Sequence, residues 1–162
     1  MSKIEIKDLY LIFGHEKQKA LKMLKKDKSK EEILKDTGCT VGVKDANLSI
    51  NEGEFFVIMG LSGSGKSTLL RCINRLIRPT AGQVLVNGVD ISKISEKELL
   101  QERLKELAMV FQNFGLLPHR SVLSNIAFGL ELQGVKKEER AKKAMESMML
   151  VGLKGYENQM VG

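Results

Sequence analysis

The sequence predicts an α/β fold, and three observations lead to this prediction. Short strand-like apolar segments are interleaved with segments of helical spacing over most of the 162 residues. A glycine-rich segment, VIMGLSGSGKST at residues 57–68, begins on an apolar strand-like run and leads into a helical one. Asn87-Gly88 follows a further strand-like run and is typical of a tight antiparallel hairpin.

Composition is that of a soluble globular domain. Hydrophobic residues make up 43% of the chain and charged residues 28%. No apolar run approaches the roughly 20 residues needed to span a bilayer. The N-terminus alternates apolar and polar residues and lacks the apolar core of a signal peptide. We therefore expect a cytoplasmic protein with Cys39 and Cys72 reduced.

The net charge of +6 permits binding to nucleotide phosphates, anionic lipid or nucleic acid, and does not choose among them. Aromatic residues make up only 5% of the chain, and there is no tryptophan. Because single-stranded nucleic acid is bound by stacking on aromatic rings, this composition argues against nucleic acid as a partner.

The first third of the chain predicts three strands and an insertion. The strands are Lys3–Leu9, Val43–Ile50 and Glu54–Met59. Between the first two, His15–Asp36 holds eight lysines and five acidic residues, with apolar residues at helical spacing. We expect one or two amphipathic helices there, as a lysine-rich insertion at about residues 15–38.

The rest of the chain predicts helices with two short strands. The expected helices are Thr68–Ile77, Ser95–Lys105, Ser121–Leu132 and Lys136–Leu150, and the expected strands are Gln83–Asn87 and Leu107–Phe111. Ser95 with Glu98 three residues later forms a capping box, which predicts a helix start.

Gly60 to Ser67 fits the pattern G-x-x-x-x-G-K-[ST] of a P-loop. Residues without bulky side chains let backbone N–H groups surround a phosphate, and the helix that follows adds its positive N-terminal dipole. Lys66 would supply a charge to the β- and γ-phosphates, and Ser67 a hydroxyl to Mg²⁺. The alternative is a plain glycine-rich linker, but the flanking strand and helix favour the P-loop. The predicted ATP-binding residues are Gly60, Leu61, Ser62, Gly63, Ser64, Gly65, Lys66, Ser67 and Thr68.

The sequence around this loop resembles the ATP-binding domain of ABC transporters. INEGEFFVIMGLSGSGKSTLLRCINRL, PTAGQVLVNGVDI and VFQ stand in family order. LLPHRSVLSNIAFGLELQGV and TGCTVGVKDANL resemble the ATPase subunit of glycine betaine/proline importers most. The resemblance implies a P-loop NTPase core of the ABC ATPase type with an antiparallel β subdomain, incomplete at the C-terminus. Residues 1–162 would be the N-terminal part of one ATP-binding domain.

The resemblance implies roles for two more residues. Phe13 falls where the family places the aromatic ring that stacks on adenine, although ordinary core packing is the other interpretation. Gln112 falls at the Q-loop glutamine, which reaches Mg²⁺ and the γ-phosphate, so Ser67 and Gln112 are the expected metal ligands. Asn113–Asn125 would face the coupling helix of the membrane subunit, or be a plain surface loop.

The same resemblance implies an ATPase that uses ATP and Mg²⁺ and couples their binding to the import of osmoprotectants. Its partners would be an integral membrane permease, a second copy of the ATPase and, indirectly, a periplasmic or extracellular substrate-binding protein. Its place would be the cytoplasmic face of the inner membrane. The family's signature and Walker B motifs do not occur in this sequence. We therefore assign no catalytic residue and expect this chain to be inactive alone. The alternative is a P-loop nucleotide-binding module outside transport.

Overall fold

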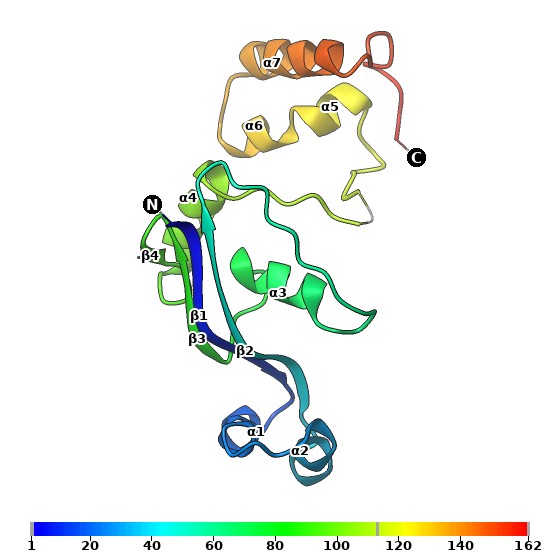
Figure 1. Ribbon diagram of the computed structural model, residues 1–162. Coiled ribbons are helices and arrows are strands. Elements are labelled where there is room, and N and C mark those ends of the chain that lie inside the picture. The colour runs from blue at the N-terminus through cyan, green and yellow to red at the C-terminus, as the bar shows by residue number, and fades with distance from the viewer. Residues whose placement is uncertain (1, 113, 162) are drawn as a thin grey trace. The chain divides into compact units, whose positions relative to one another are not determined.

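The protein folds into two compact units, which divide between Leu107 and Ala108. This architecture comes from a computed structural model that describes residues 2–112 and 114–161 (Figure 1). The first unit holds the sheet with helices α1 to α4, and the second holds α5 to α7. Within the described ranges, no helix combines the length and apolar character needed to cross a bilayer.

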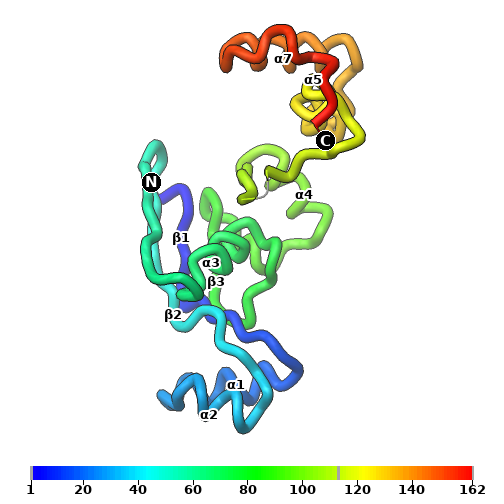
Figure 2. The backbone as a smooth tube through the Cα atoms, turned by 90° about the vertical axis from the view of Figure 1, so that its right-hand side faces the viewer, coloured from blue at the N-terminus to red at the C-terminus, as the bar shows by residue number. Residues whose placement is uncertain are grey.

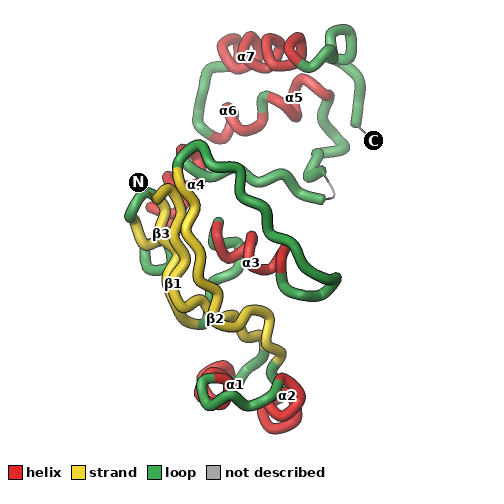
Figure 3. The backbone as a smooth tube through the Cα atoms, in the orientation of Figure 1, coloured by secondary structure: helices red, strands yellow, loops and turns green. Residues whose placement is uncertain are grey.

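A long β-hairpin organises the first unit. β1 (Ser2–Phe13) pairs antiparallel with β2 (Thr40–Asn51) along their whole lengths, from Ser2 opposite Asn51 to Phe13 opposite Thr40. β3 (Ala81–Val86) pairs with the other edge of β1, and β4 (Val89–Asp90) pairs with β3. The strand order is β2-β1-β3-β4, and it is antiparallel throughout. Figure 3 shows β1, β2 and β3 in yellow, side by side. Both predicted hairpin strands are confirmed and extend beyond their expected bounds.

Two short helices replace the turn between β1 and β2. α1 (Lys17–Leu24) and α2 (Lys30–Thr37) lie at the end of the hairpin far from the N-terminus (Figures 1 and 2). Ser29 caps α2 in a capping box with Glu32. A small apolar core joins these tip helices to the strand ends. The one or two helices expected in this segment are confirmed as two, and its being an insertion stays a prediction. The buried residues of this core are Ile12, Ala20, Leu21, Leu24, Ile33, Cys39 and Val41.

The main core lies between the sheet and the helices α3 (Lys66–Ile73) and α4 (Glu96–Lys105). Asn87 and Gly88 connect β3 to β4 with φ values of 49° and 80°, as a type I′ turn requires. Ser95 and Glu98 form the expected capping box. The hairpin turn and the start of α4 are therefore confirmed. The buried core residues are Ile6, Leu9, Leu11, Cys72, Ile73, Val84, Val86, Ile91 and Leu99.

Two arginines anchor the C-terminal end of α3. The side chain of Arg75, only 5% exposed, donates hydrogen bonds to the Ile94 carbonyl at 2.8 Å and to the Glu96 carboxylate at 2.7 Å. Arg103 of α4 donates to the carbonyls of Asn74 and Arg75 at 3.1 and 2.9 Å. Carbonyls at a helix end have no partner within the helix. These contacts satisfy carbonyls just past the end of α3 and fix that helix to α4.

Two predicted strands are not formed. After Asn51 the chain leaves the sheet, and residues 54–59 run as an irregular segment in which Phe55 is 92% exposed. Residues 107–111 are also irregular, and Val110 is 93% exposed. A continuous apolar strand of this kind is stable when it is paired on its edges and covered on both faces. No strand among residues 2–112 and 114–161 pairs with either segment, and so neither becomes a strand.

The second unit is a helical layer closed by the C-terminal segment. Ser121 caps α5 (Val122–Ile126), and α6 (Phe128–Leu132) follows directly after Ala127, so the predicted single helix 121–132 is broken there. α7 (Lys137–Leu150) packs on both through buried Ala144 and Met148. The Val122 N–H donates to the Gln159 carbonyl at 2.8 Å, which ties the end of the chain to α5.

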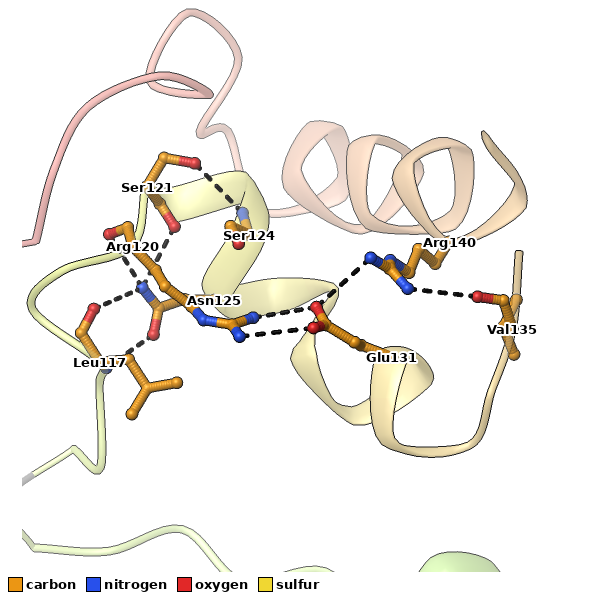
Figure 4. Close-up of polar contacts among 8 residues, drawn as sticks. All are labelled: Leu117, Arg120, Ser121, Ser124, Asn125, Glu131, Val135 and Arg140. Atoms are coloured by element: carbon orange, nitrogen blue, oxygen red, sulfur yellow. Dashed lines mark hydrogen bonds and ion pairs between the residues drawn. The ribbon is translucent and has the colours of Figure 1, made fainter. Parts of the chain in front are cut away.

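A polar network organises the loop before α5 (Figure 4). The Asn125 amide donates to the carbonyls of Leu117, Arg120 and Ser121 at 3.1 to 3.2 Å, and its oxygen accepts the Leu117 N–H at 2.8 Å. The Arg120 guanidinium binds both oxygens of Glu131 at 2.9 and 3.4 Å and lies 4.8 Å from the centre of the Phe128 ring. Arg140 approaches the same carboxylate at 3.5 Å. Loop, α6 and α7 are thus joined through one carboxylate.

We expect Glu131→Gln to destabilise the chain near neutral pH and to lose this effect in acid. The hydrogen bond from Arg120, with the charges of Arg120 and Arg140, holds the pKa of Glu131 below its usual 4.5. A lowered folded pKa contributes stability above the unfolded pKa, and this stability is lost as the pH falls through the folded value. Chemical denaturation at several pH values measures the difference between parent and variant.

The matched control is Glu146→Gln on the exposed side of α7, which removes the same charge from a carboxylate that makes no ion pair within residues 2–112 and 114–161. The free energy of unfolding of Glu146→Gln should differ much less from that of the parent at every pH. An effect of Glu131→Gln that stayed constant down to strongly acidic pH would contradict an ionic role for this carboxylate.

Candidate nucleotide-binding site

The glycine-rich loop lies directly against the backbone of β2. α3 begins at Lys66, and its N-cap is Gly65 with a φ of 93°, in the left-handed region. A Cβ at Gly65 would stand 2.5 Å from the carbonyl oxygen of Gly42, closer than real contacts allow. Only glycine satisfies both the dihedral angle and this close approach. The last glycine of the predicted P-loop is therefore what seats the loop on the hairpin.

Lys66 closes the loop from the helix side. Its ammonium group donates to the carbonyls of Gly60 and Leu61 at 2.8 and 2.6 Å and to the hydroxyl of Ser64 at 3.3 Å. The Ser64 N–H donates to the Leu61 carbonyl at 3.2 Å. The positive charge of Lys66 thus stands at the N-terminus of α3, where the helix dipole also favours an anion.

A cavity of about 400 Å³ opens beside this loop, within the first unit. Its walls come from the loop and α3, from β2 and from the first residue of α2. No carboxylate or histidine is among the described lining residues, whereas three lysines are. This lining suits a polyanion and offers no general base. The lining residues are Lys30, Gly42, Val43, Lys44, Ala46, Ile58, Met59, Gly60, Ser64, Gly65, Lys66 and Leu69.

The structure places four of the nine predicted P-loop residues in the wall of this cavity. Gly60, Ser64, Gly65 and Lys66 line the cavity, and the other predicted loop residues adjoin it in the chain. Ser67 is exposed at the second residue of α3, and Thr68 follows half-buried. Leu61, Ser62 and Gly63 form the exposed turn of the loop, where Leu61 supplies a carbonyl to Lys66.

Phe13 and Gln112 lie outside the lining of this cavity. Phe13 ends β1, and its side chain packs over Gly42, where an added Cβ would meet the ring at 2.7 Å. The ring, 41% exposed, therefore adjoins a lining residue. Gln112 belongs to the second unit and is exposed. The roles of both residues remain predictions. Asn113 lies outside the described residues, and residues 114–125 include the loop held by Asn125.

The loop is suited to magnesium bound together with a nucleotide. No group of three or more His, Cys, Asp or Glu side chains in the described parts of the chain could hold a metal by itself. Mg²⁺ in nucleotide sites keeps several waters and takes few protein oxygens besides the phosphates. The exposed Ser67 hydroxyl at the start of α3 offers such an oxygen ligand.

Lys30 and Lys44 are lining residues that sequence reasoning missed. The sequence predicts Lys30 only as part of the lysine-rich helical segment and Lys44 only as part of the strand Val43–Ile50, without assigning either to the site. The position of the lysine-rich segment between β1 and β2 could have indicated this, because the segment that connects two paired strands lies at one end of their hairpin. The pairing of Phe13 with Thr40 places α2 next to the start of β2, the part of the strand against which the P-loop lies.

Comparisons with known proteins agree with this architecture. The family model described as ABC transporter matches residues 43–161. A solved dimeric bacterial ABC transporter cassette superposes with a TM-score of 0.76 at 29% identity, covering 97% of this chain and 61% of that chain. A structure of a cassette bound to ADP and Pi gives the same TM-score and identity over 98% and 61%. The predicted fold class, an ABC ATPase core with an antiparallel β subdomain, is confirmed.

The relatives are ATP-binding proteins of transport systems. The glycine betaine/proline betaine transport system ATP-binding protein ProV of Escherichia coli is 59% identical over 154 residues, which are 95% of this chain and 38% of the relative. The glycine betaine/carnitine transport ATP-binding protein GbuA of Listeria monocytogenes is 55% identical over 98% of this chain and 40% of its own length. The chain thus spans about two-fifths of these relatives. With its P-loop on an antiparallel hairpin and a family match over more than half of its length, this chain belongs to the ABC transporter family.

Proposed function

We propose that this chain binds Mg-ATP as the N-terminal part of the ATP-binding subunit of an importer for glycine betaine-type osmoprotectants. The observation that carries the proposal is the identity of 54–59% to ATP-binding proteins whose names specify glycine betaine transport. Methionine import proteins match over shorter stretches, 68–74% of the chain. The betaine relatives also cover the tip helices, which supports a transporter of that group over a P-loop module outside transport.

Residues 60–68 would hold the triphosphate. A phosphate near the start of α3 would compete for the Lys66 ammonium, which now contacts the Gly60 and Leu61 carbonyls. Replacing these carbonyls by a phosphate is favourable, because the ammonium forms a stronger hydrogen bond with a charged phosphate than with a neutral carbonyl. Bound Mg²⁺ would neutralise part of the phosphate charge, with Ser67 and Gln112 as its protein ligands. Phe13 would stack on the adenine, beside Gly42 in the wall of the cavity.

The partners of the proposed subunit follow from its class. A membrane permease would dock on residues 113–125, whose described part is held in shape by Asn125 and the Arg120–Glu131 pair. A second copy of the ATP-binding subunit would complete the ATPase, and a periplasmic or extracellular substrate-binding protein would act through the permease. The subunit would sit as a peripheral protein on the cytoplasmic face of the inner membrane. Hydrolysis would require groups beyond those of the described cavity lining, which has no general base.

We expect Lys66→Ala to abolish most of the affinity for Mg-ATP and for inorganic tripolyphosphate. The lysine contributes a charge at the phosphate site and is not part of the buried core. Isothermal titration with both ligands measures this loss, and circular dichroism checks the fold. Lys97→Ala, which removes an exposed lysine of α4, is the control and should bind both ligands like the parent. Equal ATP affinity in Lys66→Ala and the parent would exclude the loop as the phosphate site.

A chimera tests the transport proposal. We expect glycine betaine uptake to persist when residues 1–162 replace the matching part of ProV in cells that lack their own copy, since the two sequences are 59% identical over 95% of this chain. The same chimera carrying Lys66→Ala should not support uptake. A chimera that is expressed at the normal level and binds ATP, yet gives no uptake, would contradict the proposed role in this importer class.

A further inference from the structure

We propose that Lys30, the first residue of the inserted helix α2, binds the phosphate chain of the nucleotide held by the P-loop. The inference rests on the proposed function of that loop and adds a residue from outside the P-loop motif. The tip helices would then be part of the nucleotide site, through a charge that approaches from α2 while Lys66 approaches from α3.

The cavity, which is open to solvent, has Lys30 and the P-loop in the same wall. Lys30 contributes to its wall together with Gly60, Ser64 and Lys66, and the strand residues Gly42 to Ala46 lie in the same wall. All these residues belong to the first unit. A polyphosphate seated at the start of α3 would therefore lie in the space that Lys30 also borders.

The charge of Lys30 is not neutralised by the protein. Among residues 2–112 and 114–161, its ammonium group makes no hydrogen bond or ion pair, whereas that of Lys44, in the same wall, pairs with Asp27 at 3.2 Å. Lys30 is also the first residue of α2, where the helix dipole is positive and a cation is unfavourable. The charge of Lys30 therefore does not stabilise α2. An anionic ligand would offset the repulsion between the Lys30 ammonium and the positive end of the helix dipole.

The backbone that carries Lys30 is held firmly. Ser29 and Glu32 form a capping box around it, and Ile33, one turn later, is fully buried in the tip core. The pair between Lys44 and Asp27 ties the turn before α2 to β2. The backbone position of Lys30 in the cavity wall is therefore fixed before a ligand binds, and binding would order only the lysine side chain.

A phosphate chain fits Lys30 better than the base or the ribose. The lysine ammonium is a compact, strongly hydrated point charge that selects anions, whereas planar recognition of a base suits other groups. The described lining has no carboxylate that could occupy Lys30 instead. Of the parts of a nucleotide, the phosphate chain alone carries the negative charge that this position lacks.

The test compares Lys30→Ala with Lys35→Ala in the 162-residue chain. Lys35 lies on the same helix, is exposed, and does not line the cavity. Alanine is a good helix former, and removing a cation from the first turn favours the helix, so Lys30→Ala should leave α2 folded. Circular dichroism checks this. Isothermal titration then uses Mg-ATP, inorganic tripolyphosphate and adenosine as probes, with Lys30→Arg as the variant that keeps the charge.

We expect Lys30→Ala to weaken the binding of Mg-ATP and of tripolyphosphate by a similar factor, roughly 2- to 5-fold, as for one exposed charged contact. Adenosine binding should not change, Lys30→Arg should retain most of the affinity, and Lys35→Ala should match the parent. A loss for Mg-ATP without a loss for tripolyphosphate would move Lys30 to the nucleoside and overturn the proposal. If Lys30→Ala and Lys35→Ala lost the same amount of affinity, the loss would reflect the net charge of the chain and not a contact made by Lys30. That result would also overturn the proposal.

Failure of this inference can be told apart from failure of the proposed function. If Lys66→Ala abolishes ATP binding while Lys30→Ala leaves all three ligands unchanged, the P-loop remains the nucleotide site and Lys30 is excluded from it. If the parent chain and Lys66→Ala bind Mg-ATP equally, the proposed function fails, and the proposal for Lys30 fails with it.

Discussion

The contact between Gly65 and Gly42 is the constraint on which the site depends. It brings the start of α3 against the backbone of β2, so closely that a single Cβ at Gly65 would meet the Gly42 carbonyl oxygen at 2.5 Å. The Phe13 ring covers Gly42 as well, where a Cβ would come within 2.7 Å of a ring carbon. Two residues without side chains thus let a loop, a strand and an aromatic ring stack in a small space.

The long hairpin brings residues that are distant in the sequence close to this contact. Because β1 and β2 pair along their whole lengths, the tip helices stand where β2 begins, and β2 passes the P-loop a few residues later. The buried core at the tip makes those helices a rigid continuation of the sheet. At its other end α3 is held by Arg75 and Arg103. The candidate phosphate site is therefore built from elements that are each held by contacts of their own.

Local signals predicted much of this fold. The Ser95 capping box and the Asn87-Gly88 turn each depend on a few neighbouring residues, and both are confirmed. The P-loop spacing is local in the same way, and four of its residues line one cavity, while their role in phosphate binding stays a prediction. The apolar segments 54–59 and 107–111 were predicted as strands and are irregular. Their composition satisfies the local requirement for a strand, but strand formation also needs a pairing partner, which a local pattern does not report.

The candidate site was predictable in part for the same reason. Gly60 to Thr68 form a continuous motif and could be recognised from spacing alone. Lys30 and Lys44 join the site only because strands separated by the inserted helices pair with each other, a non-local event that composition does not encode. Phe13 was found through a family resemblance, and the structure adds its packing on Gly42. Gln112 lies in the other unit, so its role rests on the resemblance.

Hydrogen–deuterium exchange with and without Mg-ATP tests the central claim most directly, because it reports on every segment of the hairpin and loop in one measurement. The account predicts that the nucleotide slows exchange in residues 60–68 and, in the same titration, around Lys30 and Gly42 to Ala46, which share the cavity wall. Exchange in the Asn87-Gly88 turn should not change. Protection confined to segments outside the P-loop and β2 would contradict the claim that this cavity holds the nucleotide.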